Sequence, residues 1–197
     1  MSLNYAEDYV LENERARLEP LSVAHYKALS TWVDEKEIWT FFLGRSNGAE
    51  DFKAYFEDAL RARTLGKEYP FAVFDKEQDV YAGCTRLFDY EESLQIIRLG
   101  YTWYGKKFWG SGLNKHCKYL LLEFVFEHLQ LERLGLGAHA ENERSIQAMK
   151  SIGCKEEGVI RNAFPAIKES GRANAVLLGV LKSEWFSTAK QTLKQKL

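Results

Sequence analysis

A basic, glycine-containing loop is the first place in this 197-residue chain where the residue types could do chemistry. It reads Lys107-Phe-Trp-Gly110-Ser-Gly112 and lies between a predicted strand and the longest predicted helix. The first backbone amides of a helix have no intrahelical partner, and the aligned peptide dipoles place about half a positive charge there. Glycine lets the backbone approach a bulky anion without a Cβ in the way. The loop therefore predicts a phosphate site, with a simple tight connection as the alternative interpretation.

Charge is distributed unevenly around this loop. Residues 93–122 contain no acidic residue, whereas residues 75–92 contain six. The positive charges in the first window are Arg98, Lys106, Lys107, Lys115 and Lys118. A chain of net charge −1 that clears carboxylates from one window keeps that region suited to an anion. Five charges are few for a nucleic-acid surface, so no stable nucleic-acid partner is expected, and a solvated basic face is the alternative interpretation.

A second polar cluster, Asn142-Glu-Arg-Ser145, follows the next predicted strand and begins another helix. Asparagine is a favoured N-cap, worth about 1 kcal/mol over alanine, so a capped helix is one interpretation. In the other interpretation, Asn142 and Ser145 face the same crevice as the glycine loop. Both motifs follow the carboxyl ends of neighbouring strands, which is where open α/β sheets bind ligands.

The hydrophobic pattern predicts strands and helices that alternate around these loops. Predicted strands occupy residues 15–21, 70–75, 80–88, 94–104, 133–138, 156–161 and 174–181. Predicted helices occupy residues 22–33, 50–63, 112–130 and 143–152, followed by a polar helix or loose end from residue 183. Helix 112–130 has an apolar stripe from Leu113 to Leu129, with His116 and Glu123 on the opposite face. Because hairpin-length turns join the middle three strands, the pattern predicts an α/β (α+β) fold with a mixed sheet flanked by helices.

Composition limits the class of protein. With 46% hydrophobic residues and no linker, the chain is expected to form a single domain over residues 1–197. No apolar run approaches the ~18 residues of a membrane span, and the first fifteen residues are acidic, so a cytoplasmic protein without a membrane partner is expected. Three widely spaced cysteines and four histidines without ligand spacing predict a reducing compartment and no metal site.

Together, the two motifs resemble the GNAT acyltransferases. The shared order is basic-x-x-Gly-x-Gly after a strand, a long helix, a strand, and Asn-x-x-Ser before a helix that ends in glycine. Residues 109–114 (Trp-Gly-Ser-Gly-Leu-Asn) and 15–21 (Arg-Ala-Arg-Leu-Glu-Pro-Leu) are similar to the RimJ/RimL-like branch, which acetylates ribosomal-protein N-termini. The resemblance covers about residues 11–182. It implies a mostly antiparallel sheet splayed open in its middle, and acetyl-CoA as the cosubstrate.

The resemblance also assigns roles to residues. It implies that the backbone at Tyr101 and Trp103 pairs with pantetheine, that Asn142 contacts the same arm, and that Ser145 protonates the departing thiolate. The residues it implies for the pyrophosphate loop and helix start are Lys107, Gly110, Ser111, Gly112, Leu113 and Asn114. Many family members have a tyrosine as general acid where this chain has Met149, which cannot donate a proton. The acid role then falls to Ser145, to water or to neither.

The acceptor side is less well defined. The implied reaction is direct attack of a neutral amine in a ternary complex. An α-amine of pKa about 7.7–8.0 needs little help to lose its proton, whereas a lysine near 10.4 needs a base. His139 titrates in the right range for a base, with a structural histidine as the alternative. The residues that resemble the family's variable substrate segment, or else belong to the core, are Trp39, Phe41 and Phe42.

Three functional hypotheses remain open at this point. The first is N-acetylation of a protein N-terminus of the ribosomal type. The second is acetylation of a small-molecule amine or antibiotic by the same machinery. The third is a non-catalytic CoA-binding module, which the methionine at position 149 and the lack of a clear base favour. Homodimers are common in the resembled branch, although nothing in the sequence demands one.

Overall fold

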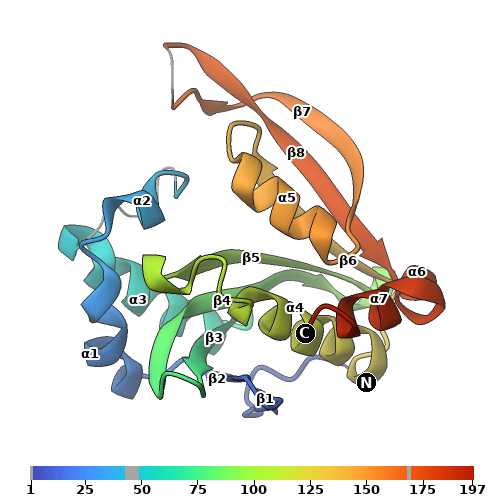
Figure 1. The fold of residues 1–197 in the computed structure, drawn as a ribbon, viewed down its shortest axis with the longest axis horizontal. Coiled ribbons are helices and arrows are strands. Elements are labelled where there is room, and N and C mark those ends of the chain that lie inside the picture. Colours follow the sequence, from blue (N-terminus) through green and yellow to red (C-terminus); the bar gives the residue numbers. More distant parts are fainter. Residues whose placement is uncertain (1, 43–48, 168–169) are drawn as a thin grey trace.

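A mixed β-sheet with helices on both faces forms the molecule (Figure 1). The computed structural model describes residues 2–42, 49–167 and 170–197. In these ranges the strands are β1 (Leu11–Glu12), β2 (Ala16–Pro20), β3 (Glu68–Asp75), β4 (Val80–Glu91), β5 (Ile96–Tyr104), β6 (Arg133–His139), β7 (Lys155–Pro165) and β8 (Arg172–Leu181). Their order is β1-β2-β3-β4-β5-β6-β8-β7, and only the β5–β6 pair is parallel among the pairs described. The predicted mixed sheet flanked by helices is confirmed.

The helices are mostly where the hydrophobic pattern predicts them. They are α1 (Tyr26–Leu29), α2 (Lys36–Trp39), α3 (Ala49–Thr64), α4 (Leu113–Glu123), α5 (Glu143–Ser151), α6 (Lys182–Glu184) and α7 (Lys190–Lys194). Short 3₁₀ turns lie at Val23–His25, Ser30–Trp32, Glu92–Leu94 and Lys106–Phe108, and π-helical turns at Phe124–His128 and Trp185–Ala189. The predicted helix 112–130 is therefore an α-helix that ends in a π-turn.

The prediction of one continuous helix over residues 22–33 is wrong. The segment is a 3₁₀ turn, the single turn α1 and a second 3₁₀ turn. These changes of direction bring different side chains to the sheet. Leu29 is fully buried, and the indole of Trp32 donates a hydrogen bond to the carbonyl oxygen of Tyr81 at 2.8 Å. Tertiary packing overrides the local preference for one helix.

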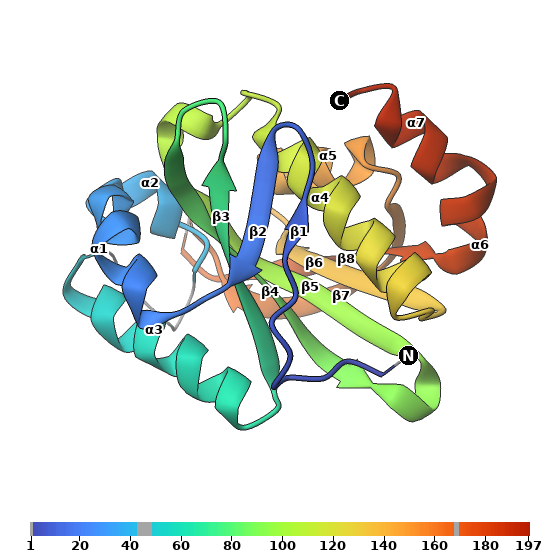
Figure 2. The same ribbon diagram turned by 90° about the horizontal axis from the view of Figure 1, so that it is seen from below.

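Two hydrophobic clusters cover the two faces of the sheet. One contains Leu113, Leu121 and Phe126 from α4 and its π-turn, with Leu87 and Leu134 from the sheet. The other is formed by α1, α2 and α3 against the opposite face. Figure 2 shows α7 beside α4 on the first face. Helices and their hydrophobic clusters therefore pack on both faces of the sheet and fix the position of its central strand β5.

His116 differs from its predicted position on a polar helix face. It is 6% exposed, and its Nδ1 lies 3.2 Å from Asn13 Nδ2. Burial lowers its pKa. The segment that leads into β2 covers this side of α4, so the helix is buried over a wider arc than a single apolar stripe.

The sheet opens between β5 and β6. Their register runs from Ile96–Arg133 to Arg98–Gly135 and has no further pair in the described residues. Beyond this point β6, β8 and β7 rise away from β5, and α5 lies on the inner side of that half (Figure 1). Where neighbouring strands diverge, backbone and side chains of both strands line a crevice, and this crevice contains the candidate site.

Candidate functional site

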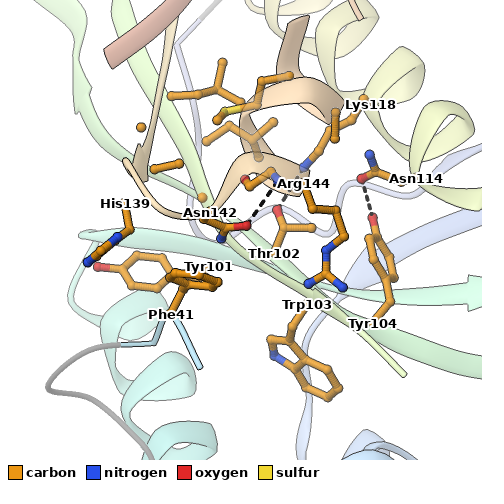
Figure 3. A pocket seen from close by; sticks show the side chains of 18 of the residues that line it. Phe41, Tyr101, Thr102, Trp103, Tyr104, Asn114, Lys118, His139, Asn142 and Arg144 are labelled. Carbon is orange, nitrogen blue, oxygen red and sulfur yellow. Dashed lines mark hydrogen bonds between the residues drawn. The ribbon is translucent and has the colours of Figure 1, made fainter. Parts of the chain in front are cut away.

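A cavity of about 540 Å³ fills the crevice between β5 and β6. Its wall includes residues from β5, β6, α4 and α5. It also includes Ile38 from α2 and two phenylalanines from the loop after it. Seven predicted site residues border it together with the two phenylalanines of the substrate segment. These are Tyr101, Trp103, Gly110, Asn114, His139, Asn142 and Ser145. Motifs some forty residues apart in the chain therefore open into one space (Figure 3).

The glycine loop has the geometry of an anion site. Gly110 and Gly112 have φ of +76° and +91°, and a Cβ on either would meet no atom within 4 Å. Gly112 is the N-cap of α4 and has no side chain to cap it, and the first turn has no acidic residue. The Leu113 amide donates a long hydrogen bond of 3.4 Å to Ser111 Oγ. Amides at such a helix start attract a phosphate through both hydrogen bonding and the helix dipole. The helix start is open, and its chemistry fits the diphosphate of CoA.

The other predicted loop residues contribute backbone or packing. Leu113 is fully buried, and Ser111 Oγ donates a hydrogen bond to the carbonyl oxygen of Phe108 at 2.8 Å. The Lys107 ammonium lies 4.8 Å from the ring centroids of both Trp32 and Phe108, so its side chain turns away from the cavity. Its charge can still act over distance, while the close contacts at this loop would come from amides.

Asn142 is both a helix cap and a cavity residue. Its Oδ1 accepts a hydrogen bond from the Ser145 amide at 3.1 Å, which begins α5. The same side chain borders the cavity, together with Ser145 and Arg144 (Figure 3). The two interpretations drawn from the sequence are therefore compatible, because capping uses only the amide oxygen of Asn142 and leaves its Nδ2 group for a ligand.

A β-bulge shapes the edge of β5 at the cavity. The register with β4 passes from Cys84–Trp103 to Arg86–Gly100, so two residues of β5 oppose one of β4. Tyr101 has φ of +50°, a strained value for a non-glycine residue. Bulges redirect side chains and often adjoin functional sites. Here the bulge leaves Thr102 on the α4 side of the sheet, where its Oγ1 lies 2.8 Å from Thr85 Oγ1.

The end of the cavity beside α2, where the sequence analysis expects the acceptor, is aromatic. Phe41 and Phe42 border it, and the ring of Phe41 lies 5.4 Å from that of His139. Trp39 lies outside the lining; it is 5% exposed, and its indole donates to the Val33 carbonyl oxygen at 2.7 Å. Of the three aromatic residues named for the substrate, two therefore border the cavity and one lies in the core behind them.

His139 is held in place by its neighbours. Its Nε2 lies 2.9 Å from the carbonyl oxygen of Pro165, and its Nδ1 accepts a hydrogen bond from the Glu141 amide at 3.1 Å. A carbonyl oxygen can only accept, so these partners assign the proton to Nε2. The Nδ1 lone pair is occupied by the Glu141 amide. In this arrangement His139 orients the end of β6 and has no free lone pair for an incoming amine.

Three basic residues line the cavity that the sequence analysis does not predict as site residues. Lys118 of α4 borders the cavity although it is 5% exposed, and Arg144 of α5 places its guanidinium over the Trp109 ring. Arg98 borders the other end and pairs with Asp89 at 3.3 Å. The signal for Lys118 was its spacing, because it lies four residues after Asn114 on the same helix face.

The cavity is cationic. Among the described lining residues none is Asp or Glu, whereas three carry arginine or lysine side chains. No group of His, Cys, Asp and Glu in the described part of the chain could hold a metal ion. None of its helices is both long and apolar enough to cross a membrane. The arrangement suits an anionic ligand and offers no carboxylate as a base.

Comparison with known proteins identifies relatives of this chain. Residues 15–155 match the family model of the acetyltransferase (GNAT) domain. The "Uncharacterized N-acetyltransferase p20" of Bacillus licheniformis is 26% identical over 141 residues, which are 66% of this chain and 77% of that protein. The "Putative ribosomal N-acetyltransferase YdaF" of Bacillus subtilis is 29% identical over 103 residues, which are 52% of this chain and 55% of that protein.

A solved structure extends the likeness over nearly the whole chain. The GCN5-related N-acetyltransferase from Brucella melitensis superposes with a TM-score of 0.84 at 25% identity. The match covers 96% of this chain and 85% of that one.

Proposed function

The chain belongs to the GNAT acetyltransferase family, and from that premise we propose that it transfers an acetyl group from acetyl-CoA to a protein N-terminal α-amine of the ribosomal type. The proposal places it in the RimJ/RimL-like branch, with the whole chain acting as one acetyltransferase domain. The similarity to the B. subtilis protein named as a ribosomal N-acetyltransferase supports the choice of branch. Bound acetyl-CoA supplies the activated acetyl group.

One observation carries the proposal: the open, glycine-lined start of α4 shares a cavity with Asn142 and Ser145. We propose that the amides from Gly110 to Asn114 hold the diphosphate. The open edge of β5 at Tyr101 and Trp103 and the Asn142 side chain then hold the pantetheine arm. Backbone groups on a splayed strand can hydrogen-bond an extended ligand as they would a neighbouring strand.

The lining of the cavity favours an α-amine as acceptor. An α-amine of pKa about 7.7–8.0 is substantially neutral near physiological pH, whereas a lysine near 10.4 needs a base to become nucleophilic. The described lining contains no carboxylate, and the His139 lone pair is occupied. Phe41 and Phe42 would surround the first side chain of the acceptor with apolar surface. These features suit a peptide whose N-terminal amine reacts without a strong base.

Calorimetry with acetyl-CoA is the first test. We expect saturable binding at physiological salt, and the absence of binding at millimolar cosubstrate would contradict the proposal.

Thiol release then identifies the acceptor class. Peptides with a free N-terminus are compared with the same peptides blocked at the N-terminus but carrying an internal lysine, and with a panel of small primary amines. We expect turnover only with the free N-terminus. Turnover with small amines but no peptide would favour a metabolite or antibiotic as acceptor. Cosubstrate binding without transfer to any amine would indicate a non-catalytic CoA-binding module.

A further inference from the structure

A lysine lies where the crevice meets α4, beneath the bulge of β5. Lys118 is 5% exposed, and its side chain borders the cavity. Its Nζ donates a hydrogen bond to Thr102 Oγ1 at 2.8 Å (Figure 3). Thr102 Oγ1 also lies 2.8 Å from Thr85 Oγ1. The ammonium group is therefore held on the cavity wall, beside the strand edge that is proposed to bind pantetheine.

The charge of Lys118 has no carboxylate partner among the described residues. Arg86, also buried, shows the usual arrangement, with Glu68 at 2.7 Å from its guanidinium. Around Lys118 the ionisable neighbours are the thiols of Cys117 and Cys154. Burial lowers the pKa of Lys118 to about 8. An unpaired buried cation costs stability, and such groups occur where a charge is needed for function.

The other titratable groups near Lys118 do not change charge in the same range. Burial raises the pKa of both Cys117 and Cys154 to about 12, and it also raises that of Tyr104. Arg98 and Arg144 border the same cavity; burial lowers the pKa of Arg144, but a guanidinium is not deprotonated in proteins. The remaining titratable lining residues are Tyr101 and His139, and His139 has both ring nitrogens in hydrogen bonds.

Resting on the proposed function, we propose that Lys118 is the acid of the reaction and gives its proton to the sulfur of the departing coenzyme A. The acceptor nitrogen forms its bond to the acetyl carbon as the carbon–sulfur bond breaks, and the electron pair of that bond stays on sulfur. Lys118 Nζ transfers one proton to this sulfur and becomes neutral. The surplus proton of the acceptor nitrogen goes to water, and Lys118 takes a new proton from water before the next turnover.

Lys118 suits this role better than the other side chains of the cavity. Met149, in the same lining, has no proton to give. The Ser145 hydroxyl is a far weaker acid than a thiol. An alkyl thiol has a pKa of about 8.5, close to that of Lys118, so proton transfer between them is nearly balanced. An ammonium group also attracts the negative charge that grows on sulfur, before any proton moves.

The test uses coenzyme A itself and needs no acceptor. The bound thiol is titrated by the ultraviolet absorption of its thiolate in the parent protein, Lys118→Met, Lys118→Arg and the control Lys150→Met. Lys150 lies on α5, outside the cavity, where it pairs with Glu156. Methionine is an unbranched, uncharged side chain one atom shorter than lysine, and arginine keeps the charge if the apolar variant fails to fold.

We expect the bound thiol to titrate at least about one unit lower in the parent protein and Lys150→Met than in Lys118→Met, because a nearby cation favours the thiolate. Lys118→Arg is expected to retain most of this lowering. Equal thiol titration in the parent and Lys118→Met, with coenzyme A bound by both, would overturn the inference and leave the proposed function intact. Failure of the parent protein to bind coenzyme A would overturn both.

Turnover gives a second readout once an acceptor is known. Lys118→Met is expected to lower kcat by about 10²-fold or more, the usual contribution of a general acid, with coenzyme A affinity changed little. The parent protein should lose activity as pH rises above about 8, where Lys118 loses its proton. This alkaline loss should be absent in Lys118→Arg. An unchanged alkaline limb in Lys118→Arg would contradict proton donation by Lys118.

Discussion

The two ends of the crevice are built from different parts of the protein. At the proposed diphosphate end, the groups offered to a ligand are backbone amides of one short stretch, those of Gly110, Gly112 and Asn114, since the Ser111 and Leu113 amides donate within the loop. At the acceptor end, they are side chains from α2 and its following loop, β4, β5, β6 and β7, among them Phe41, Phe88 and Phe164. The first end depends on dihedral angles that glycine permits, and the second depends on how distant segments pack.

This difference explains why the two ends are not equally visible in a sequence. A backbone site leaves a contiguous pattern of glycines before a helix, and that pattern predicts the geometry of the loop. An aromatic wall assembled from five elements leaves no pattern, because each ring looks like a core residue until the fold is known. Four variants test this contrast, in order of decreasing expected effect.

Gly112→Val should give the largest effect. Valine is strained at φ of +91°, and its side chain would project into the open space in front of the helix amides. We expect the Kd for coenzyme A to rise about 100-fold or more, the equivalent of one or two charge-assisted hydrogen bonds, as measured by calorimetry. Gly171→Val is the matched control, since Gly171 has φ of +118° and equally open surroundings outside the cavity. Equal loss of affinity in both variants would mean that backbone strain, and not a blocked site, is responsible.

Lys118 lies between the two ends of the crevice, and Lys118→Met should increase the stability of the protein. The pKa of Lys118 falls from 10.5 to about 8 on folding, so the folded protein holds fewer protons than the unfolded chain between these pH values. The loss of stability caused by burying the charged lysine is complete below pH 8 and disappears as pH approaches 10.5. At pH 7 we expect the variant to gain about 1–3 kcal/mol in free energy of unfolding, measured with urea. A variant less stable than the parent at pH 7 would show that Lys118 holds the fold together.

Phe41→Ala should affect only the acceptor end. We expect the KM for the acceptor to rise about tenfold, equivalent to 1.4 kcal/mol of lost apolar contact. The Kd for coenzyme A should stay within about twofold of the parent, because the Phe41 ring packs beside His139 and belongs to a different segment from the glycine loop. Phe186→Ala, an exposed phenylalanine in the π-turn after α6, provides the same substitution far from the cavity. A rise in the Kd for coenzyme A with Phe41→Ala would show that the two ends are not independent.

Variants of Asn142 should have the smallest effect, and they separate its role as a helix cap from its proposed role in binding a ligand. Asn142→Ser keeps an N-cap oxygen for the Ser145 amide but removes the Nδ2 group, whereas Asn142→Ala removes both. The alanine variant should lose about 1 kcal/mol of stability, measured by thermal unfolding, and the serine variant only a few tenths. Both should bind coenzyme A a few-fold more weakly. Unchanged affinity in Asn142→Ser would show that Asn142 serves only as a cap.

Much of the fold follows from local pattern. The helix over residues 113–123 and the strands around it have strong periodicity and clear boundaries, and these elements carry the glycine loop and Asn142. The structure of residues 22–33 is harder to predict from the sequence, because contacts to β4 divide a helical pattern into short turns. Local propensity is weaker than tertiary packing over so short a segment.

The least predictable features are charged or polar groups that the fold buries. Lys118 belongs to a basic window that is typical of a surface. Its spacing from Asn114 gives only its helix face, and the position of α4 in the fold shows that this face borders a cavity. Histidine is a common general base, yet a hydrogen bond from His139 Nε2 to the carbonyl oxygen of Pro165, on another strand, holds this side chain in a structural position. Such assignments depend on neighbours that the sequence does not place side by side.

The early separation of β5 from β6 also affects how the protein avoids aggregation. Beyond Arg98 and Gly135, each of the two strands keeps one side without a neighbouring strand among the described residues. Exposed strand edges usually recruit other chains, which is why natural proteins cover or charge them. Here the bare margins face each other across the cavity, so they point into the crevice and not toward neighbouring molecules (Figure 1). The protein can therefore present hydrogen-bonding backbone to a ligand without becoming a template for fibres.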